Sequence, residues 1–187
     1  MHRLLPGADQ GVVKLLRFSF PKRRYLQGFL AGRPLQAIGS VSDLRAGDTV
    51  AVWASNPLRQ AAEALPGVTV LRVEDGFLRS VGLGAQLARP LSWVVDSLGI
   101  YYDPAGPSEL ETLLETNRFD AGQLARAAEL RKRIVAARLS KYNVGSSRWP
   151  GLSARRTPSQ PVVLVVGQVE RDASVRAGAA AIATNIG

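Results

Sequence analysis

Short apolar runs alternate with a helical pattern between residues 34 and 75. Three runs are rich in β-branched residues and are bounded by Gly, Asp or Pro, which predicts strands in PLQAIG (from residue 34), GDTVAVWAS (from 47) and GVTVLRVED (from 67). Between the second and the third, residues 57–65 begin with proline and carry Leu and Ala at helical spacing. This order of strand, helix and strand favours a parallel sheet covered by helices.

The pattern continues with two further strands and two helices. LSWVVD (91–96) reads as a strand, and GIYYD (99–103) as a second, short strand after a tight turn. A helix is expected to begin after Ser108, because Glu111 stands at the position that completes a capping box. A longer helix follows from 121 to about 138, with basic residues in its last turns, where they favour the negative end of the helix dipole.

The two ends of the chain differ from this regular middle. We expect an irregular leader over residues 1–33, with one short helix around 24–31, and a domain over 34–145. Residues 146–160 lack apolar periodicity and read as a linker, and 161–187 as the start of a second domain. That last part opens with PVVLVVGQ, the strongest buried-strand signal in the chain. Two interpretations stay open: the strand joins the first sheet, or the chain is a fragment of a two-domain protein.

Composition narrows the class of protein. A hydrophobic fraction of 46% with 21% charged residues is typical of a folded domain with a buried core. Cysteine is absent and His2 is the single histidine, so we expect no metal site built on thiolate or imidazole and no Ser/His/Asp triad. The apolar residues near the N-terminus are interrupted too often for a signal peptide, and no run approaches a membrane span. We therefore expect a soluble, cytoplasmic protein.

The formal net charge of +9 is compatible with several kinds of anionic binding partner. Nucleic acid, acidic sugars, nucleotides and an anionic membrane face would each suit it. The basic residues gather at 22–24, 131–141 and 148–156, without the aromatic-interleaved strand or reading helix of a nucleic-acid module. Specific nucleic-acid binding is therefore not expected, although a basic nucleic-acid module stays as an alternative function.

Two polar stretches follow predicted strands. In VEDGFLRSVGLG (73–84), Glu74 and Asp75 stand where open α/β sheets bind ligands. The glycines fit neither a dinucleotide fingerprint nor a P-loop, and the alternative is that the acids cap a turn while Arg79 pairs with one of them. In GQVERDAS (167–174), Gln168, Glu170, Asp172 and Ser174 alternate and would share one side of an extended segment; the alternative is a surface loop.

A third stretch, KYNVG (141–145), closes the basic helix, with Asn143 or Gly145 as its left-handed cap. Taken in order, RVEDGFLRSVGLGAQLARPLSWVVDSLGIYYDPAGPSELETLL, RKRIVAARLSKYNVG and VVLVVGQVERDAS resemble a module of the KpsC-type capsule polysaccharide proteins, over about residues 47–185. These are retaining β-Kdo glycosyltransferases that use the donor CMP-Kdo.

The resemblance implies an α/β fold with a Rossmann-like, mostly parallel sheet and flanking helices. The chain would be the N-terminal half of a two-domain, GT-B-like transferase plus the first strand of the second half. It implies no cofactor besides the donor substrate CMP-Kdo, a lipid-linked Kdo acceptor, and capsule-assembly proteins at the inner membrane as partners. Peripheral attachment to that membrane is left open.

The resemblance also assigns site residues. It implies Asp172 as the nucleophile and Glu74 as the general acid/base, and retention indeed requires two carboxyl groups, as in retaining glycosidases. The residues implied in contact with the sugars are Arg79, Ser80, Gln168, Ser174, Lys141, Tyr142 and Asn143. An arginine is well shaped to bind a sugar carboxylate.

One departure from the family concerns the second half. Family members continue through a KPHPD-like motif and further segments expected to hold the nucleotide, and this sequence ends before them. We therefore expect a truncated chain with little or no transferase activity by itself. The alternative within this interpretation is a remnant without catalytic activity that binds a glycan or a partner protein.

Overall fold

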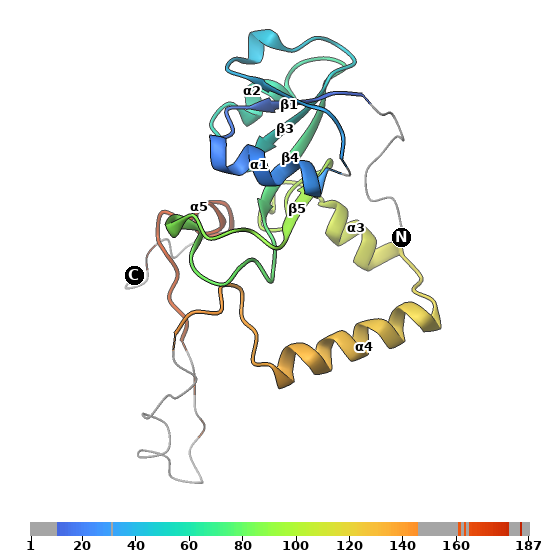
Figure 1. The fold of residues 1–187 in the computed structure, drawn as a ribbon, viewed down its shortest axis with the longest axis vertical. Helices are drawn as coiled ribbons and strands as arrows, with labels where there is room; N and C mark the ends of the chain where they lie inside the picture. The colour runs from blue at the N-terminus through green and yellow to red at the C-terminus, as the bar shows by residue number, and fades with distance from the viewer. Residues whose placement is uncertain are drawn as a thin grey trace.

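The computed structural model describes residues 11–30, 32–145, 161, 163, 165–179 and 184. Its centre is a five-stranded sheet in the order β2-β1-β3-β4-β5 (Figure 1). The strands are β1 (Val13–Leu16), β2 (Leu35–Ile38), β3 (Thr49–Trp53), β4 (Thr69–Asp75) and β5 (Trp93–Asp96). The first four are parallel, and β5 runs antiparallel to β4. This confirms the predicted α/β class with a mostly parallel sheet.

The sheet is buried on both faces because apolar side chains alternate between two core clusters. One cluster lies under α1 (Phe20–Phe29) and includes Leu15, Ala51 and Leu71. The other includes Leu16 and Val50, and it contains Ala62 of α2 (Arg59–Glu63). Adjacent residues of one strand thus enter opposite clusters, which explains why the strands read as continuous apolar runs.

The remaining helices lie beyond β5. They are α3 (Glu109–Thr116), α4 (Ala121–Ala136) and the short α5 (Ala173–Gly178); two 3-10 turns span Val41–Asp43 and Gly84–Gln86. Ser108 and Glu111 form the predicted capping box of α3. Figure 1 shows α3 and α4 extending away from the sheet, and α4 buries none of its residues. No helix in the described ranges is both long and apolar enough to cross a membrane.

The prediction of an irregular leader is wrong for residues 11–30. The strand β1 lies inside the sheet, paired with β2 on one side and with β3 on the other. The helix α1 begins at Phe20, earlier than expected, with Pro21 in its first turn. A strand of four residues carries little periodic signal of its own, and its burial depends on partners distant in sequence.

Two predicted strands are not formed. Residues 99–103 are irregular, with a turn at Tyr101 and Tyr102. The buried carboxylate of Asp96 accepts hydrogen bonds from the backbone N–H groups of Leu98 (2.8 Å) and Gly99 (2.9 Å) and so turns the chain as soon as β5 ends. Over 161–168, none of the described residues is in a strand, and Val165 and Val166 are exposed. A strand requires a neighbour for its backbone hydrogen bonds, and none is present in the described sheet for this segment.

The predicted cap of the basic helix is also wrong. The helix α4 ends at Ala136, and the left-handed residue after it is Arg138, with φ 51°. Asn143 and Gly145 are left-handed as well, with φ 52° and 98°, but they lie in the turn beyond. The side chain of Asn143 makes a contact that is described below.

Candidate active site

The candidate site begins at the carboxyl end of β4, where Glu74 and Asp75 close the strand. The chain turns away at Gly76, whose N–H donates to the Ser92 carbonyl at 3.1 Å. A Cβ on Gly76 would lie 2.9 Å from the carbonyl carbon of Ser92. Only glycine therefore fits where the two backbones meet.

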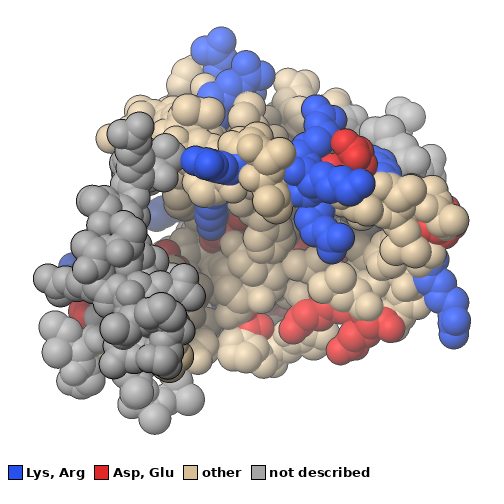
Figure 2. Space-filling model, turned by 90° about the horizontal axis from the view of Figure 1, so that it is seen from below, with Lys and Arg blue, Asp and Glu red and all other residues tan. Residues whose placement is uncertain are grey.

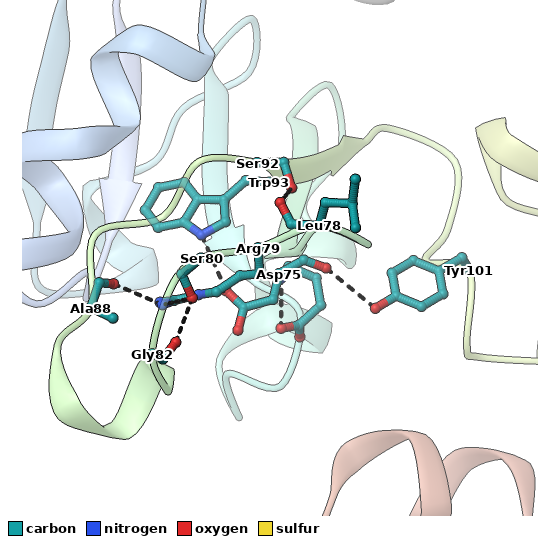
Figure 3. Close-up of polar contacts among 10 residues, drawn as sticks. Asp75, Leu78, Arg79, Ser80, Gly82, Ala88, Ser92, Trp93 and Tyr101 are labelled. Atoms are coloured by element: carbon teal, nitrogen blue, oxygen red, sulfur yellow. Dashed lines mark hydrogen bonds and ion pairs between the residues drawn. The ribbon is translucent and has the colours of Figure 1, made fainter. Parts of the chain in front are cut away.

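Arg79 is a buried centre of polar contacts rather than an open sugar ligand (Figure 3). Its Nε donates to Asp75 Oδ1 at 3.0 Å, and its Nη1 donates to Ser80 Oγ (3.0 Å) and to the Ala88 carbonyl (2.7 Å). Trp93 Nε1 donates to the same Asp75 oxygen at 3.2 Å. The pairing of Arg79 with an acid, kept open as an alternative, is thus present, and the acid is Asp75. Its neighbour Glu74 is left for other contacts.

Glu74 is a largely buried carboxyl with neutral donors. One oxygen accepts from the backbone N–H of Asp75 at 3.0 Å, and the other from the Tyr102 hydroxyl at 3.4 Å. Burial raises the pKa of Glu74, and the charge of Asp75 adds to this effect, whereas Lys22 and Lys141 oppose it. Burial, together with Glu74, also raises the pKa of Tyr102. An acid placed in this way holds its proton at a higher pH than an exposed one.

The segment 141–143 packs against the loop that follows β4. The Lys141 carbonyl accepts from the N–H groups of Arg79 (2.8 Å) and Ser80 (3.2 Å), and Asn143 Nδ2 donates to the Ser80 carbonyl at 3.0 Å. Ser80 is buried, and its hydroxyl donates to the Gly82 carbonyl at 2.7 Å. Both side chains therefore hold backbone in place.

Asp172 lies at the start of α5. Its Oδ1 accepts from the backbone N–H (2.9 Å) and the hydroxyl (2.7 Å) of Ser174. These hydrogen bonds lower the pKa of Asp172, and Lys141 and Arg176 lower it further. The expectation of four alternating side chains on one extended segment is wrong, because the chain turns at Glu170 and Arg171 and becomes helical at Ala173.

One cavity of about 860 Å³ is lined by both carboxyl groups, Glu74 and Asp172. Of the residues singled out in the sequence, it is also lined by Arg79, Lys141, Tyr142, Gln168 and Ser174. Ser80 and Asn143 are not among its lining residues. The topology thus brings residues about a hundred positions apart to one cavity. Within the described residues, no group of three or more His, Cys, Asp or Glu side chains could hold a metal ion.

Further lining residues were missed in the sequence. They are Lys22, Trp53, Ser55, Tyr101, Tyr102, Arg171 and Arg176. Tyr101 donates to the Asp75 carbonyl at 3.4 Å, and burial with nearby acids raises the pKa of Tyr101 to about 12. The pair of tyrosines in GIYYD was a usable signal that we assigned to a strand. Lys22 was noted only as part of the basic cluster 22–24, and it was not considered for the site because it stood in the presumed leader.

Basic side chains on the face shown in Figure 2 form separate groups divided by uncharged surface. The described residues on that face therefore do not form the continuous basic stripe that would follow a phosphate backbone. The cavity has its own basic lining residues, including Lys22, Lys141, Arg171 and Arg176.

The fold and the cavity define a Rossmann-like α/β domain that offers a ligand site at the carboxyl edge of its sheet. Residues 48–186 match the family described as capsule polysaccharide biosynthesis protein, and the chain belongs to this family. It is 45% identical over 119 residues to the capsule polysaccharide modification protein LipA of Neisseria meningitidis, covering 64% of this chain and 16% of LipA. It is 46% identical over 151 residues to the lipopolysaccharide-processing protein LpsZ of Rhizobium meliloti, covering 78% of this chain and 30% of LpsZ.

Two solved structures are also similar to this chain. The β Kdo 2,7 transferase of Thermosulfurimonas dismutans KpsC is similar with a TM-score of 0.70 and 31% identity, over 93% of this chain and 54% of that one. The β Kdo 2,4 transferase of the same protein gives 0.69 and 34%, over 88% and 51%. The chain therefore spans about half the length of these transferases and less of the curated relatives. Its fold corresponds to the part of the GT-B-like transferase that it covers.

Proposed function

We propose that this chain is a β-Kdo transferase module of capsule polysaccharide biosynthesis, which transfers Kdo from CMP-Kdo to a lipid-linked Kdo acceptor with retention. The observation that carries the proposal is the pair of carboxyl groups on one cavity with opposite pKa shifts: raised for Glu74, lowered for Asp172. Two such environments separate the roles of two carboxyl groups in one site. The likeness to the two KpsC transferases supports the substrate class.

The proposed reaction has two displacements at the anomeric carbon. In the first, a carboxylate oxygen of Asp172 bonds to the anomeric carbon. The bond between that carbon and the phosphate oxygen breaks, and CMP leaves with the electron pair. In the second, the acceptor hydroxyl gives its proton to Glu74 and bonds to the carbon, while the bond to Asp172 breaks. Two inversions give net retention.

The shifted pKa values suit these roles. Hydrogen bonds from Ser174 hold the pKa of Asp172 low, so the nucleophile is ionised at neutral pH. The raised pKa of Glu74 makes its carboxylate a stronger base for a hydroxyl proton. The cavity also presents Lys141, Arg171 and Arg176, which can stabilise the charge that develops on the departing phosphate.

The test combines substitution with detection of the covalent adduct. Purified protein is mixed with CMP-Kdo and a lipid-linked Kdo acceptor, alone and with the remaining half of a KpsC relative supplied as a second polypeptide. The chain alone is expected to give little transfer, because it spans about half of each KpsC chain. In the supplemented reaction, Asp172→Asn should lower the rate by about a thousandfold or more, and Glu74→Gln by about 10²–10⁴-fold.

Mass spectrometry supplies a second readout. Glu74→Gln should accumulate Kdo on a peptide that contains Asp172, because the second displacement is slowed more than the first. Glu115→Gln, an exposed carboxyl of α3, is the matched control and should leave the rate unchanged. A retained rate in Asp172→Asn refutes the nucleophile. Acceptor binding without turnover in every mixture favours the non-catalytic alternative.

A further inference from the structure

Lys22 lies on the cavity wall in an unusual environment for a lysine. It belongs to the first turn of α1, and its Nζ lies 3.1 Å from the centroid of the Trp53 ring. Trp53 is itself fixed by edge-on contacts with Phe18 and Trp93, whose ring centroids lie 6.3 and 5.6 Å away. A cation over an indole face is attracted by the ring and held in position. The fold therefore holds the ammonium group at a defined position over Trp53.

This ammonium has no anionic contact of its own. Within the described part of the chain, it forms neither an ion pair nor a hydrogen bond with a side chain or carbonyl. Asp75, the nearby acid, is already bonded to Arg79 and Trp93. Burial lowers the pKa of Lys22, and the charges of Glu74 and Asp75 only partly oppose it. A half-buried cation of this kind gains from an incoming anion.

The position of Lys22 relates it to Glu74 and not to Asp172. Lys22 lies over Trp53, whose strand partner on β4 is Val73, the residue before Glu74. Lys22 and Glu74 accordingly influence each other's pKa, whereas the cations that act on Asp172 are Lys141 and Arg176. Lys22 therefore belongs to the wall that carries the proposed base.

Lys22 also lies where two hollows meet. An adjoining hollow of about 340 Å³ shares Lys22, Trp53 and Ser55 with the main cavity. The hollow is lined further by Arg17, Phe18, Ser19, Asn56 and Pro57, and neither carboxyl of the pair reaches it. A ligand that extends from this hollow to Glu74 must pass the ammonium.

We infer that Lys22, held by Trp53, binds the carboxylate of the acceptor sugar and selects an acidic acceptor. The inference rests on the proposed function, in which the acceptor hydroxyl lies at Glu74. The acceptor's remaining sugars then occupy the hollow beside Arg17 and Asn56. Lys22 is a substrate-binding residue that positions the acceptor, and it lies in a helix outside the family match of 48–186.

The experiment compares two acceptors that differ in charge alone: a Kdo glycoside and its carboxamide. Calorimetry on the wild-type chain, Lys22→Met and Lys22→Arg measures binding of each. We expect Lys22→Met to weaken binding of the acid by about tenfold, the size of one lost charge-assisted contact, and to leave the carboxamide unchanged. Lys22→Arg should retain most of the preference for the acid. Arg24→Met, an exposed cation on the same helix, should change neither.

Several results would overturn the inference. Equal losses for the acid and the carboxamide, no loss for either, or no acid binding by the wild type would each do so. A loss that falls on CMP-Kdo instead would place Lys22 on the donor side. Failure of the proposed function is recognised separately: charge-selective binding through Lys22 with no adduct on Asp172 would leave a glycan-binding site without the transfer reaction. Unchanged thermal unfolding of Lys22→Met excludes misfolding as the cause.

Discussion

The two walls of the cavity are built in opposite ways. The wall with Glu74 is the edge of a sheet whose core residues, such as Leu71 and Val73, are almost completely buried. The wall with Asp172 is residues 165–179, where Val165 and Val166 are 87% and 78% exposed and the one helix has six residues. The first wall is held by long-range packing, whereas the hydrogen bonds that position Asp172 in the second come from Ser174, two residues away.

This difference decides how each carboxyl acquires its chemistry. The pKa of Glu74 is raised by burial, which needs the whole sheet and the tyrosines beyond it. The pKa of Asp172 is lowered by Ser174, two residues away, so the short sequence DAS is sufficient. We infer that damage to the sheet removes the raised pKa of Glu74, the proposed acid/base, while damage to the second wall changes only the position of Asp172, the proposed nucleophile.

The largest expected difference between the walls is in stability. Leu71→Ala should lower the free energy of unfolding by about 2–5 kcal/mol, because it leaves a cavity in the core under α1. Val166→Ala should change it by less than about 0.5 kcal/mol, because that side chain is exposed. Urea unfolding followed by circular dichroism measures both. A similar cost for the two variants would show that the walls are equally packed.

A smaller difference is expected between two capping aspartates. Asp96 is buried, and besides the N–H groups of Leu98 and Gly99 it accepts from the N–H of Glu109 at 2.8 Å, where α3 begins. Asp96→Ala should destabilise the protein by about 1–3 kcal/mol, since buried donors lose their acceptor. Asp172→Ala should fray α5 and cost the global fold little. Hydrogen exchange distinguishes the two results, because loss of protection confined to 173–178 is expected only in the second variant.

The smallest effect is in the pH dependence of stability. A raised folded-state pKa means that the folded protein favours protonated Glu74. The contribution of Glu74 to the stability of the fold is therefore complete below the ordinary pKa of 4.5, and it is lost as the pH rises through the folded-state pKa. Glu74→Gln, which does not titrate, should therefore gain stability relative to the wild type above pH 4.5. Asp172 behaves in the opposite way: its contribution is lost as the pH falls below 3.8, and it is small because the group is exposed. Unfolding at a series of pH values measures both, and a constant difference between wild type and Glu74→Gln would contradict the first statement.

The sequence predicted much of the sheet and of the helices, but missed one central strand. Strands at β2, β3, β4 and β5 and the helices α2, α3 and α4 follow from apolar runs, helical spacing and the Ser108 capping box. The strand β1 was missed, and the apolar run at 161–168 was wrongly predicted to be a strand. Both errors have one cause: a short, mainly apolar run becomes a strand only if neighbouring strands accept its hydrogen bonds, and the run itself does not reveal which neighbours exist.

The candidate site was likewise predicted only in part from the sequence. Two polar stretches directly after apolar runs drew attention to Glu74, Asp75 and residues 167–174, and the family resemblance then selected Glu74 and Asp172. Only the tertiary structure showed that Asp75 and not Glu74 pairs with Arg79, that Ser80 and Asn143 support backbone, and that Lys22 lies over Trp53. Sequence spacing determines which groups can share a strand end or a helix turn. Burial, and with it the charge state of a carboxyl or an ammonium, depends on what packs against the group from distant parts of the chain.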